Sequence, residues 1–355
     1  MALRTVGGRI IGSGELRLAP LPTALATWAA EISSLVSAER IRDDVEAIAE
    51  PRSRLTAPEG MARAEKHIAT ALQAAGWETA VEPFAFSDVI GVRDGAEHVA
   101  DPSVTYERLE GANVVARKRG TSGRRAILVG AHFDTVSASP GADDNASGVA
   151  ALLELARVLG SARFEHDLLL VAFDMEEIGS FGARSLIRAS TTELAAVIVF
   201  ESIGYTSNRP GSQTLLPGIG LLYPAQVGRI RRRRLVGDWT LVIFRGPSLP
   251  IACAFAEALA SLAGPDAVMT IRDPGDLPVL GGMVTRVAPW VRDFARSDHA
   301  EFWKAGVPAV QLTDTADFRN PNYHQPTDTP DTLDYARIAV VATATAVAVK
   351  HLDRG

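Results

Sequence analysis

Short runs of apolar residues alternate with segments of helical periodicity along most of this 355-residue chain. Three runs, at 126–130, 167–173 and 195–200, contain almost no polar residue, which is typical of strands buried on both faces of a sheet. The segment 148–159, between the first two runs, has the periodicity of an amphipathic helix. Strands and helices alternate in the same way further along, so the pattern predicts one three-layer α/β domain.

The other predicted elements are bounded by Gly, Pro and polar residues. We expect further strands at 79–86, 112–118, 240–244, 268–272 and 308–312, and further helices at 38–49, 60–75, 182–189, 249–262 and 332–352. Between them we expect a polar loop at 94–107 and an irregular excursion at 205–238, where Pro and Gly are frequent. Because periodicity is weak at the start, we divide the chain into an N-terminal extension, 1–37, and a main domain, 38–355.

Side chains of the kinds that bind metals follow each of the three apolar runs. They are His132 and Asp134 after the first run, Asp143 and Asp144 in the next turn, Glu176 and Glu177 after the second run, and Glu201 after the third. A second imidazole, His324, lies in a polar loop near the end of the chain. An open α/β sheet places its chemistry at the carboxyl ends of its strands, so this repetition indicates a functional site.

Two imidazoles and several carboxylates make a nitrogen and oxygen ligand set that suits zinc or a similar divalent ion. The single cysteine, Cys253, excludes a finger-type structural zinc site. Hydrolases use a pair of such ions, joined by a bridging carboxylate, to activate water. In the doublet Glu176 and Glu177, one residue can bind a metal while its neighbour takes the proton from the water.

Six segments carry a resemblance to a known family. In chain order they are HFDT, PGADDNASG, DMEE, FESIGY, RSDHAEF and NYHQPTDTPDTLDY. Together they resemble the co-catalytic di-zinc aminopeptidase family, which includes bacterial leucyl-type aminopeptidases, glutamate carboxypeptidase and, more distantly, glutaminyl cyclases. The resemblance covers residues 38–352. It implies a zinc-exopeptidase-like αβα sandwich with a central mixed, mostly parallel sheet, and it makes 38–355 a catalytic domain.

The resemblance also implies a ligand for each metal position. Asp144 would bridge two metals, His132 and Glu201 would complete one, and Glu177 and His324 would complete the other. A cis peptide bond would follow Asp144. Asp143 could take the bridging place instead, although the match to relatives favours Asp144. Relatives often have Asp where this chain has Glu201, and the longer side chain could shift that metal.

Three further residues acquire roles from the same resemblance. Glu176 matches the general base, and Asp134 matches the carboxylate that orients His132 by accepting its other ring proton. His299 falls where relatives place a Tyr or His that donates a hydrogen bond to the tetrahedral oxyanion. A structural role at the start of its helix is the alternative for His299.

These observations predict a zinc-dependent metallopeptidase of aminopeptidase type, which removes an N-terminal residue from small peptides or related amides. We expect two Zn²⁺ ions per chain, with Co²⁺ or Mn²⁺ as possible replacements. Three alternatives stay open. They are a glutaminyl-cyclase-like acyl transfer with one zinc, a carboxypeptidase or amidase acting on a specialised biosynthetic substrate, and a non-catalytic binding module. A carboxypeptidase would need a cationic pocket, for which Arg319 and the basic run 231–234 are the candidates.

Charge and hydropathy narrow the set of partners. The net charge of −6 gives no reason to expect nucleic acid as a partner, since phosphate binding needs a basic face. We interpret the basic run 231–234 as a solvated surface. No segment approaches about 18 uncharged apolar residues, so we expect no membrane contact and a cytoplasmic location. The sequence does not predict an oligomeric state.

Overall fold

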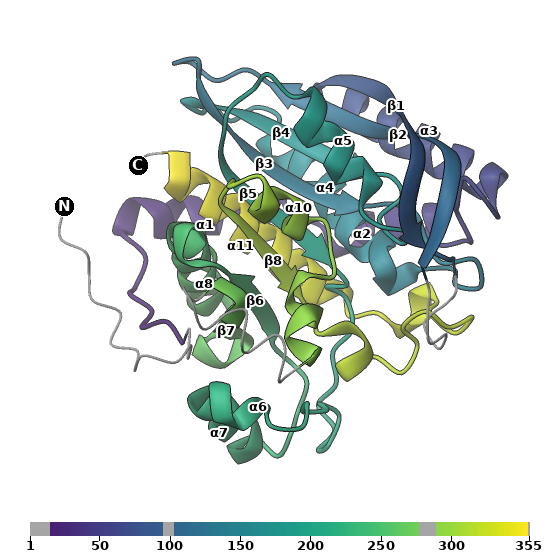
Figure 1. Ribbon diagram of the computed structural model, residues 1–355. Helices are drawn as coiled ribbons and strands as arrows, with labels where there is room; N and C mark the ends of the chain where they lie inside the picture. The colour runs from purple at the N-terminus through teal and green to yellow at the C-terminus, as the bar shows by residue number, and fades with distance from the viewer. Residues whose placement is uncertain (1–14, 95–102, 277–288, 354–355) are drawn as a thin grey trace.

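An eight-stranded sheet forms the centre of the structure, a computed structural model that describes residues 15–94, 103–276 and 289–353 (Figure 1). The strand order is β1-β2-β4-β3-β5-β8-β6-β7. In chain order the strands are β1 (Glu78–Val92), β2 (Ser103–Lys118), β3 (Arg124–His132), β4 (His166–Phe173), β5 (Leu194–Glu201), β6 (Thr240–Phe244), β7 (Val268–Arg272) and β8 (Ala309–Thr313). The run β4-β3-β5-β8 is parallel, and antiparallel pairs join β2 to β4 and β6 to β8. The predicted mixed, mostly parallel sheet is therefore confirmed.

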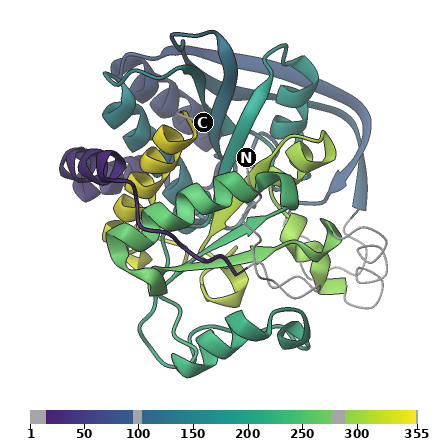
Figure 2. The ribbon, with the colours of Figure 1, turned by 90° about the vertical axis from the view of Figure 1, so that its left-hand side faces the viewer.

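Helices cover both faces of this sheet, as Figures 1 and 2 show. The helices are α1 (Thr23–Leu35), α2 (Ala38–Ile48), α3 (Pro58–Ala74), α4 (Gly148–Leu159), α5 (Phe181–Ala189), α6 (Ile219–Leu222), α7 (Pro224–Arg232), α8 (Leu249–Ala263), α10 (His299–Lys304) and α11 (Tyr335–Asp353). The larger apolar core lies between the sheet and α1, α2, α3, α4, α8 and α11. A second core lies on the opposite face, where α5, α7 and α10 pack. The three layers follow from strands that are apolar on both faces.

Two helical segments, Gly246–Ala263 and Tyr335–Asp353, are long and apolar enough to cross a membrane by length and composition alone. Both pack on the sheet, and 44% of the first and 61% of the second are buried inside the protein. Their apolar side chains are accounted for by the core, which makes this composition weak evidence for a membrane span. The expectations of no membrane contact and of a cytoplasmic location stay predictions.

Most predicted elements match the structure within a few residues, and the differences have physical reasons. Residues 103–107, predicted as part of a polar loop, belong to β2, because this end of the β1–β2 hairpin is exposed and needs few apolar residues. The final helix begins at Tyr335 rather than at residue 332, since Pro330–Thr332 forms a separate 3₁₀ turn. Part of the expected extension, residues 15–37, contains α1, which packs on α11; residues 1–14 of that segment lie outside the described residues.

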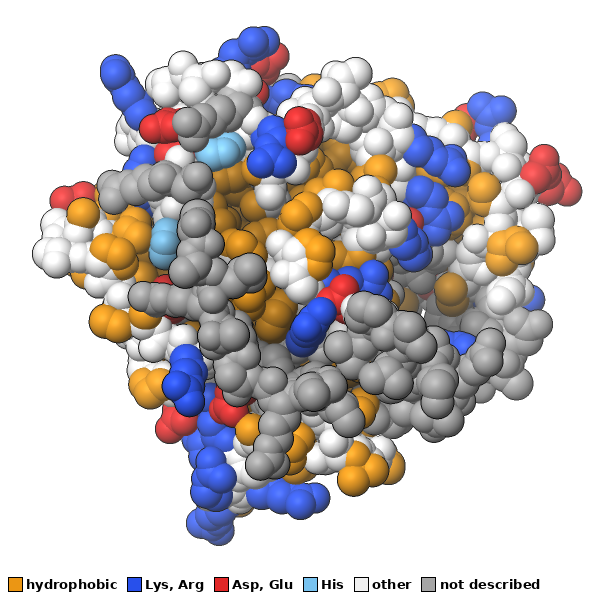
Figure 3. Space-filling view, turned by 60° about the vertical axis from the view of Figure 1, so that its left-hand side comes forward, with side chains coloured by type: hydrophobic (Ala, Val, Ile, Leu, Met, Phe, Trp, Pro, Cys, Tyr) orange, Lys and Arg blue, Asp and Glu red, His pale blue; other side chains and the backbone are white. Residues whose placement is uncertain are grey.

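The excursion at 205–238 is less irregular than expected, because it contains the short helices α6 and α7. The basic run lies at the end of α7, where Arg231, Arg232 and Arg234 are exposed. Figure 3 shows Lys and Arg side chains gathered at the bottom of the molecule, where α7 lies. The position agrees with the interpretation of the run as a solvated surface.

Parallel strands bring the site residues to one edge of the sheet. His132 ends β3, Glu201 ends β5, and Glu176 and Glu177 follow β4. The registers pair His132 with Phe173 and place β5 beside β3, so these three strand ends lie next to one another. The sheet therefore assembles side chains that are up to 69 positions apart in the sequence.

Replacement of Ile198 in the central strand β5 tests this packing. Ile198 is fully buried, so Ile198→Ala should lower the free energy of unfolding by about 2–5 kcal/mol. Ile90→Ala makes the same chemical change in β1, where the side chain is 71% exposed, and should have little effect. Urea denaturation followed by circular dichroism measures both. Equal midpoints for the two variants would contradict the arrangement of the core.

Candidate metal centre

A short kinked turn, Ala142–Ser147, presents Asp144 to the site. The Asp328 carboxylate accepts hydrogen bonds from the backbone N–H groups of Asp143 (2.9 Å) and Asp144 (3.1 Å). The Asp143 carboxylate accepts bonds from Gly204 N (2.8 Å) and Asn320 Nδ2 (2.7 Å). Asp143 thus holds the turn in place, and Asp144 is the member of the pair that faces the other ligand candidates. The predicted cis peptide bond after Asp144 is confirmed.

Arg52 also supports this turn, although no pattern in the sequence singles it out. Its fully buried guanidinium donates to the backbone oxygens of Phe133 (2.6 Å), Pro140 (2.7 Å) and Gly141 (2.9 Å). Burial lowers the pKa of Arg52 to about 10, which leaves it cationic at neutral pH. A buried cation saturated with carbonyl oxygens locks the end of β3 to the turn that carries Asp144.

Asp134 connects the ends of β3 and β4. Its carboxylate accepts hydrogen bonds from the backbone N–H groups of Glu176 (3.0 Å) and Glu177 (3.1 Å). Nδ1 of His132 lies 3.2 Å from the backbone oxygen of Asp134 and 3.4 Å from its carboxylate. The residue before Glu176, Met175, has a φ of 58°, an uncommon conformation for a residue with a side chain. Asp134 therefore holds both the imidazole and the two glutamates in position.

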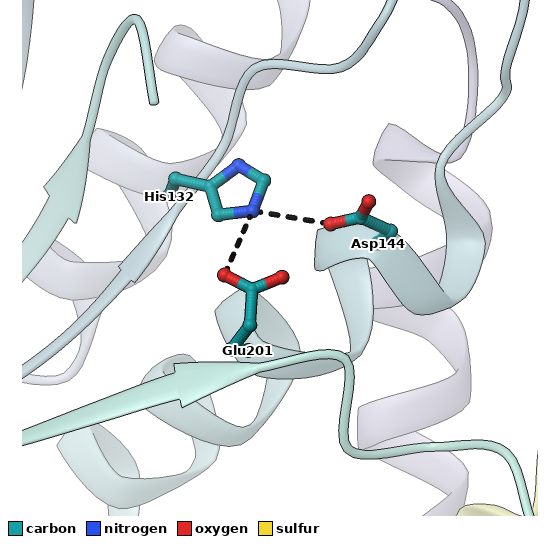
Figure 4. Close-up of side chains that lie close together, drawn as sticks. All are labelled: His132, Asp144 and Glu201. Atoms are coloured by element: carbon teal, nitrogen blue, oxygen red, sulfur yellow. Dashed lines mark ion pairs between the residues drawn. The ribbon is translucent and has the colours of Figure 1, made fainter. Parts of the chain in front are cut away.

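Three of the predicted ligands form a first group, which Figure 4 shows. Nε2 of His132 lies 3.1 Å from Oδ1 of Asp144 and 3.4 Å from Oε2 of Glu201. The hydroxyl of Ser297 donates a 2.7 Å hydrogen bond to the same Glu201 oxygen. Glu201 thus reaches the site in spite of its longer side chain, and Ser297 holds it there.

A second group uses the other oxygen of Asp144. Nε2 of His324 lies 2.8 Å from Oδ2 of Asp144 and 3.4 Å from Oε2 of Glu177. The backbone of His324 has a φ of 57°, and its ring stacks on that of Tyr323 with a centroid distance of 3.8 Å. The two groups share Asp144, which is the arrangement that a bridging carboxylate requires.

The donor atoms of both groups fit zinc in chemistry and spacing. Ligand atoms about 2.1 Å from a tetrahedral zinc ion lie about 3.4 Å from one another, close to the separations seen here. Nε2 of His132 and Oδ1 of Asp144 are buried, and neither hydrogen-bonds to the described residues. Burial raises the pKa of Asp144 to about 6, and the charge of Glu201 adds to this effect. Divalent cations would relieve this crowding of carboxylates, although the binding of zinc by these residues stays a prediction.

The two groups open into a cavity of 520 Å³. Asp144, Glu177, Glu201 and His324 line it, and so does Glu176. Burial raises the pKa of Glu176 well above its usual value, with further contributions from the charges of Glu201 and Asp298. A carboxylate of raised basicity at the cavity wall is suited to proton transfer.

The structure does not bring His299 to this cavity. Its fully buried imidazole lies at the start of α10, with Nε2 2.9 Å from the backbone oxygen of Phe294 and its ring against Trp303. Burial lowers the pKa of His299 to about 4, which makes the ring neutral. The expected contact with an oxyanion has no geometric support, because the side chain turns into the second core. A structural role at the beginning of the helix fits this position.

Tyr323 lines the cavity instead, beside His324, and the sequence analysis missed it. The signal that could have identified it is its place directly before His324 in the segment NYHQ. Burial raises the pKa of Tyr323, and the charges of Asp144 and Glu177 raise it further. The phenol therefore keeps its proton and can donate a hydrogen bond.

Comparison of the sequence with known proteins identifies a family and several relatives. Residues 113–218 and 278–349, together half of the chain, match the model of peptidase family M28. YfbL of Escherichia coli K12, an uncharacterised protein, is 35% identical over 244 residues, which are 64% of this chain and 67% of YfbL. LpqL of Mycobacterium tuberculosis, a probable lipoprotein aminopeptidase, is 27% identical over 275 residues, which cover 70% of this chain and 46% of LpqL. The chain thus spans about two thirds of one relative and less than half of the other.

Solved structures share the fold at low sequence identity. An aminopeptidase from Aneurinibacillus sp. strain AM-1 has a TM-score of 0.65 at 16% identity, over 91% of this chain and 95% of that chain. A zinc aminopeptidase from Bacillus subtilis has a TM-score of 0.62 at 13% identity, over 89% and 95%. A glutaminyl cyclase from Porphyromonas gingivalis has a TM-score of 0.60 at 18% identity, over 89% and 99%. At these identities the likeness concerns the fold.

Removal of the shared carboxylate tests the two-group geometry. We expect zinc-reconstituted wild-type protein to contain two zinc ions per chain and Asp144→Ala to lose both. His132→Ala should weaken one site by more than the 10- to 100-fold that loss of an outer-shell partner typically costs. His166→Ala is the matched control, since His166 pairs with Asp353 far from the site and its loss should leave zinc content unchanged. Elemental analysis and competitive chelation measure these values. An Asp144→Ala variant that kept both ions would show that this carboxylate does not join them.

Proposed function

Because the chain belongs to peptidase family M28, it is a metal-dependent peptidase, and we propose that it removes the N-terminal residue from peptides with the help of two zinc ions. The observation that carries the proposal is the pair of ligand groups that share Asp144 at the wall of a cavity lined by Glu176. His132, Asp144 and Glu201 would hold one ion. Asp144, Glu177 and His324 would hold the other.

When bound, the two zinc ions would polarise the scissile carbonyl and make a water molecule acidic enough to lose a proton near neutral pH. Glu176 takes that proton and delivers it to the nitrogen of the leaving amine, so the carboxylate is restored after each turnover. Asp134 fixes the backbone of Glu176 through a 3.0 Å hydrogen bond, which keeps the base at a constant place on the cavity wall.

Tyr323 supplies the oxyanion contact that the family resemblance predicts for His299. As the carbonyl carbon becomes tetrahedral, negative charge develops on its oxygen, and a fixed donor in a site screened from water stabilises that charge. The Tyr323 ring is held by stacking on His324, and its hydroxyl keeps its proton. The phenol is therefore a positioned, neutral donor beside the expected metal position.

The cavity supports recognition of an amine more than of a carboxylate. Cleavage at a C-terminus would need a free cation to bind the terminal carboxylate. Among the described residues four cations and seven carboxylates line the cavity. Arg184 and Lys304 lie 3.5 Å and 2.6 Å from Glu301, Arg296 lies 3.8 Å from Asp317, and Arg93 is the fourth cation. Acidic side chains thus outnumber basic ones in the lining, which favours an amine over a carboxylate and argues against the carboxypeptidase alternative.

Arg319 and the basic run 231–234, the cations that the sequence offers for a carboxylate pocket, do not provide such a pocket either. Arg319 is buried, and it donates to Gln213 Oε1 (2.9 Å) and to the backbone oxygen of Trp239 (2.7 Å). Its guanidinium stacks on the Trp239 ring, with 4.5 Å between Cζ and the ring centroid. The basic run at 231–234 belongs to the outer surface of α7, and none of its residues lines the cavity.

Replacement of the proposed base separates chemistry from metal binding. Glu176→Gln removes the proton carrier but leaves all five ligand candidates, so zinc content should be unchanged while kcat falls by about 10²- to 10⁴-fold. Exposed Glu110 gives the matched control, because Glu110→Gln makes the same change away from the cavity and should keep full activity. The assay is hydrolysis of aminoacyl p-nitroanilides by the zinc-loaded protein. A wild-type rate for Glu176→Gln would refute this mechanism.

Replacement of Tyr323 tests the proposed oxyanion donor. Tyr323→Phe keeps the ring that stacks on His324 and deletes only the hydroxyl. Loss of one such donor should lower kcat by about 10²- to 10³-fold, with little change in KM, because the contact forms only as charge develops on the oxygen. Steady-state kinetics with zinc content as a check provides the measurement. If KM rose and kcat stayed constant, the hydroxyl would bind the substrate rather than the transition state.

A further inference from the structure

The cavity continues from the candidate metal centre across the face of strands β8, β6 and β7. Thr313 and Gln311 of β8 line it, as do Leu241 and Ile243 of β6 and Ile271 of β7. The registers pair Thr313 with Leu241, Gln311 with Ile243, and Ile243 with Ile271. Paired residues share one face of a sheet, so these side chains form two adjacent rows on the cavity floor.

Apolar side chains enclose the space above this floor. They come from the excursion after β5, from the segment before β6 and from the segment before α10, and they are Leu215, Leu216, Ile219, Ile230, Trp239 and Phe294. Ile230, Trp239 and Phe294 are themselves buried. This part of the cavity is therefore an apolar pocket that opens toward the carboxylates of the metal centre.

Two residues on the pocket floor are polar, Thr313 and Gln311. The hydroxyl oxygen of Thr313 already accepts a 2.9 Å hydrogen bond from Thr315 N, whereas Gln311 differs. Its side chain is only 6% exposed, and its carbonyl oxygen Oε1 is buried without a hydrogen bond to any described residue. A buried amide oxygen without a donor is unfavourable, and rotation of the terminal amide can turn it toward a donor in the pocket. Gln213 also lines the cavity, but its Oε1 already accepts a hydrogen bond from Arg319. Gln311 is thus the glutamine whose acceptor is free for a bound molecule.

The sheet register places Gln311 at a defined depth. Glu201, at the strand end, pairs with Thr313, and Val199 pairs with Gln311. Gln311 consequently lies two residues further into the sheet than the metal ligand, or about 6.6 Å along the strand, and one strand to the side. This depth is on the scale of an aromatic side chain and exceeds that of a small aliphatic one.

We infer that this pocket binds an aromatic side chain that carries a hydrogen-bond donor, a phenol hydroxyl or an indole N–H, and that Gln311 accepts that hydrogen bond. The inference rests on the proposed function, under which the N-terminal side chain of the substrate enters the pocket while its carbonyl lies at the metal centre. The apolar walls contact the ring, and Gln311 distinguishes a ring with a donor from a plain phenyl ring. Gln311 is thereby a specificity-determining residue.

Binding of simple amines tests the pocket without reference to catalysis. Tyramine and phenethylamine differ only in the phenol hydroxyl, and tryptamine presents an indole N–H. Isothermal titration into the zinc-loaded full chain should show that tyramine or tryptamine binds about tenfold more tightly than phenethylamine, and the stronger of the two identifies the donor. Gln311→Leu should abolish this preference. Ile243→Val is the matched control, because it trims the floor beside Gln311 and should weaken the amines equally without changing their ratio.

Hydrolysis of the tyrosyl, tryptophyl and phenylalanyl p-nitroanilides provides the second readout, as ratios of kcat/KM. A preference for donor-bearing rings that Gln311→Leu removes would establish the role of Gln311. Equal binding and equal hydrolysis of all three by the wild type would overturn it. The experiments distinguish failure of one proposal from failure of the other. Selective binding without hydrolysis would support the pocket and refute the peptidase function. Hydrolysis without selectivity would support the peptidase function and refute the role of the pocket.

Discussion

Crowding of carboxylates around Asp144 is the constraint on which the rest of the structure depends. Asp144, Glu177 and Glu201 converge on two imidazoles, and burial raises the pKa of Asp144 and Glu177. Such a group is unfavourable in a folded protein unless cations compensate it. Two divalent ions would provide that compensation and, at the same time, the chemistry of a peptidase. The fold and the reaction therefore share one electrostatic requirement.

The scaffold around this centre is built to hold its members against that repulsion. Parallel strands bring the ligand candidates to one edge of the sheet. Neighbouring residues that are not ligand candidates hold them in place through hydrogen bonds. Asp328 and Arg52 hold the turn that carries Asp144, and Asp134 ties β3 to the start of the Glu176–Glu177 doublet. The backbone at Met175 and His324 adopts positive φ values, which persist only where surrounding contacts determine them.

The sequence predicts the elements and the ligand candidates well, because both leave local marks. Apolar runs identify β3, β4 and β5, and polar residues at their ends identify His132, Glu177 and Glu201. Contacts that depend on tertiary packing leave no such mark. Arg52 looks like a surface cation until the carbonyl oxygens around it are seen, and His299 looks like a site residue until its ring is found facing Trp303. Gln311 could not be recognised either, because one polar residue in a short strand has no meaning without the cavity beside it.

The most direct test of this account is a crystal structure of the zinc-loaded protein with anomalous diffraction recorded at the zinc absorption edge. The account predicts two anomalous peaks, one between His132, Asp144 and Glu201 and the other between Asp144, Glu177 and His324. One peak alone would instead favour the single-metal chemistry of the cyclase alternative. No peak at either group after reconstitution with zinc would contradict the central claim that the buried carboxylates are a metal centre.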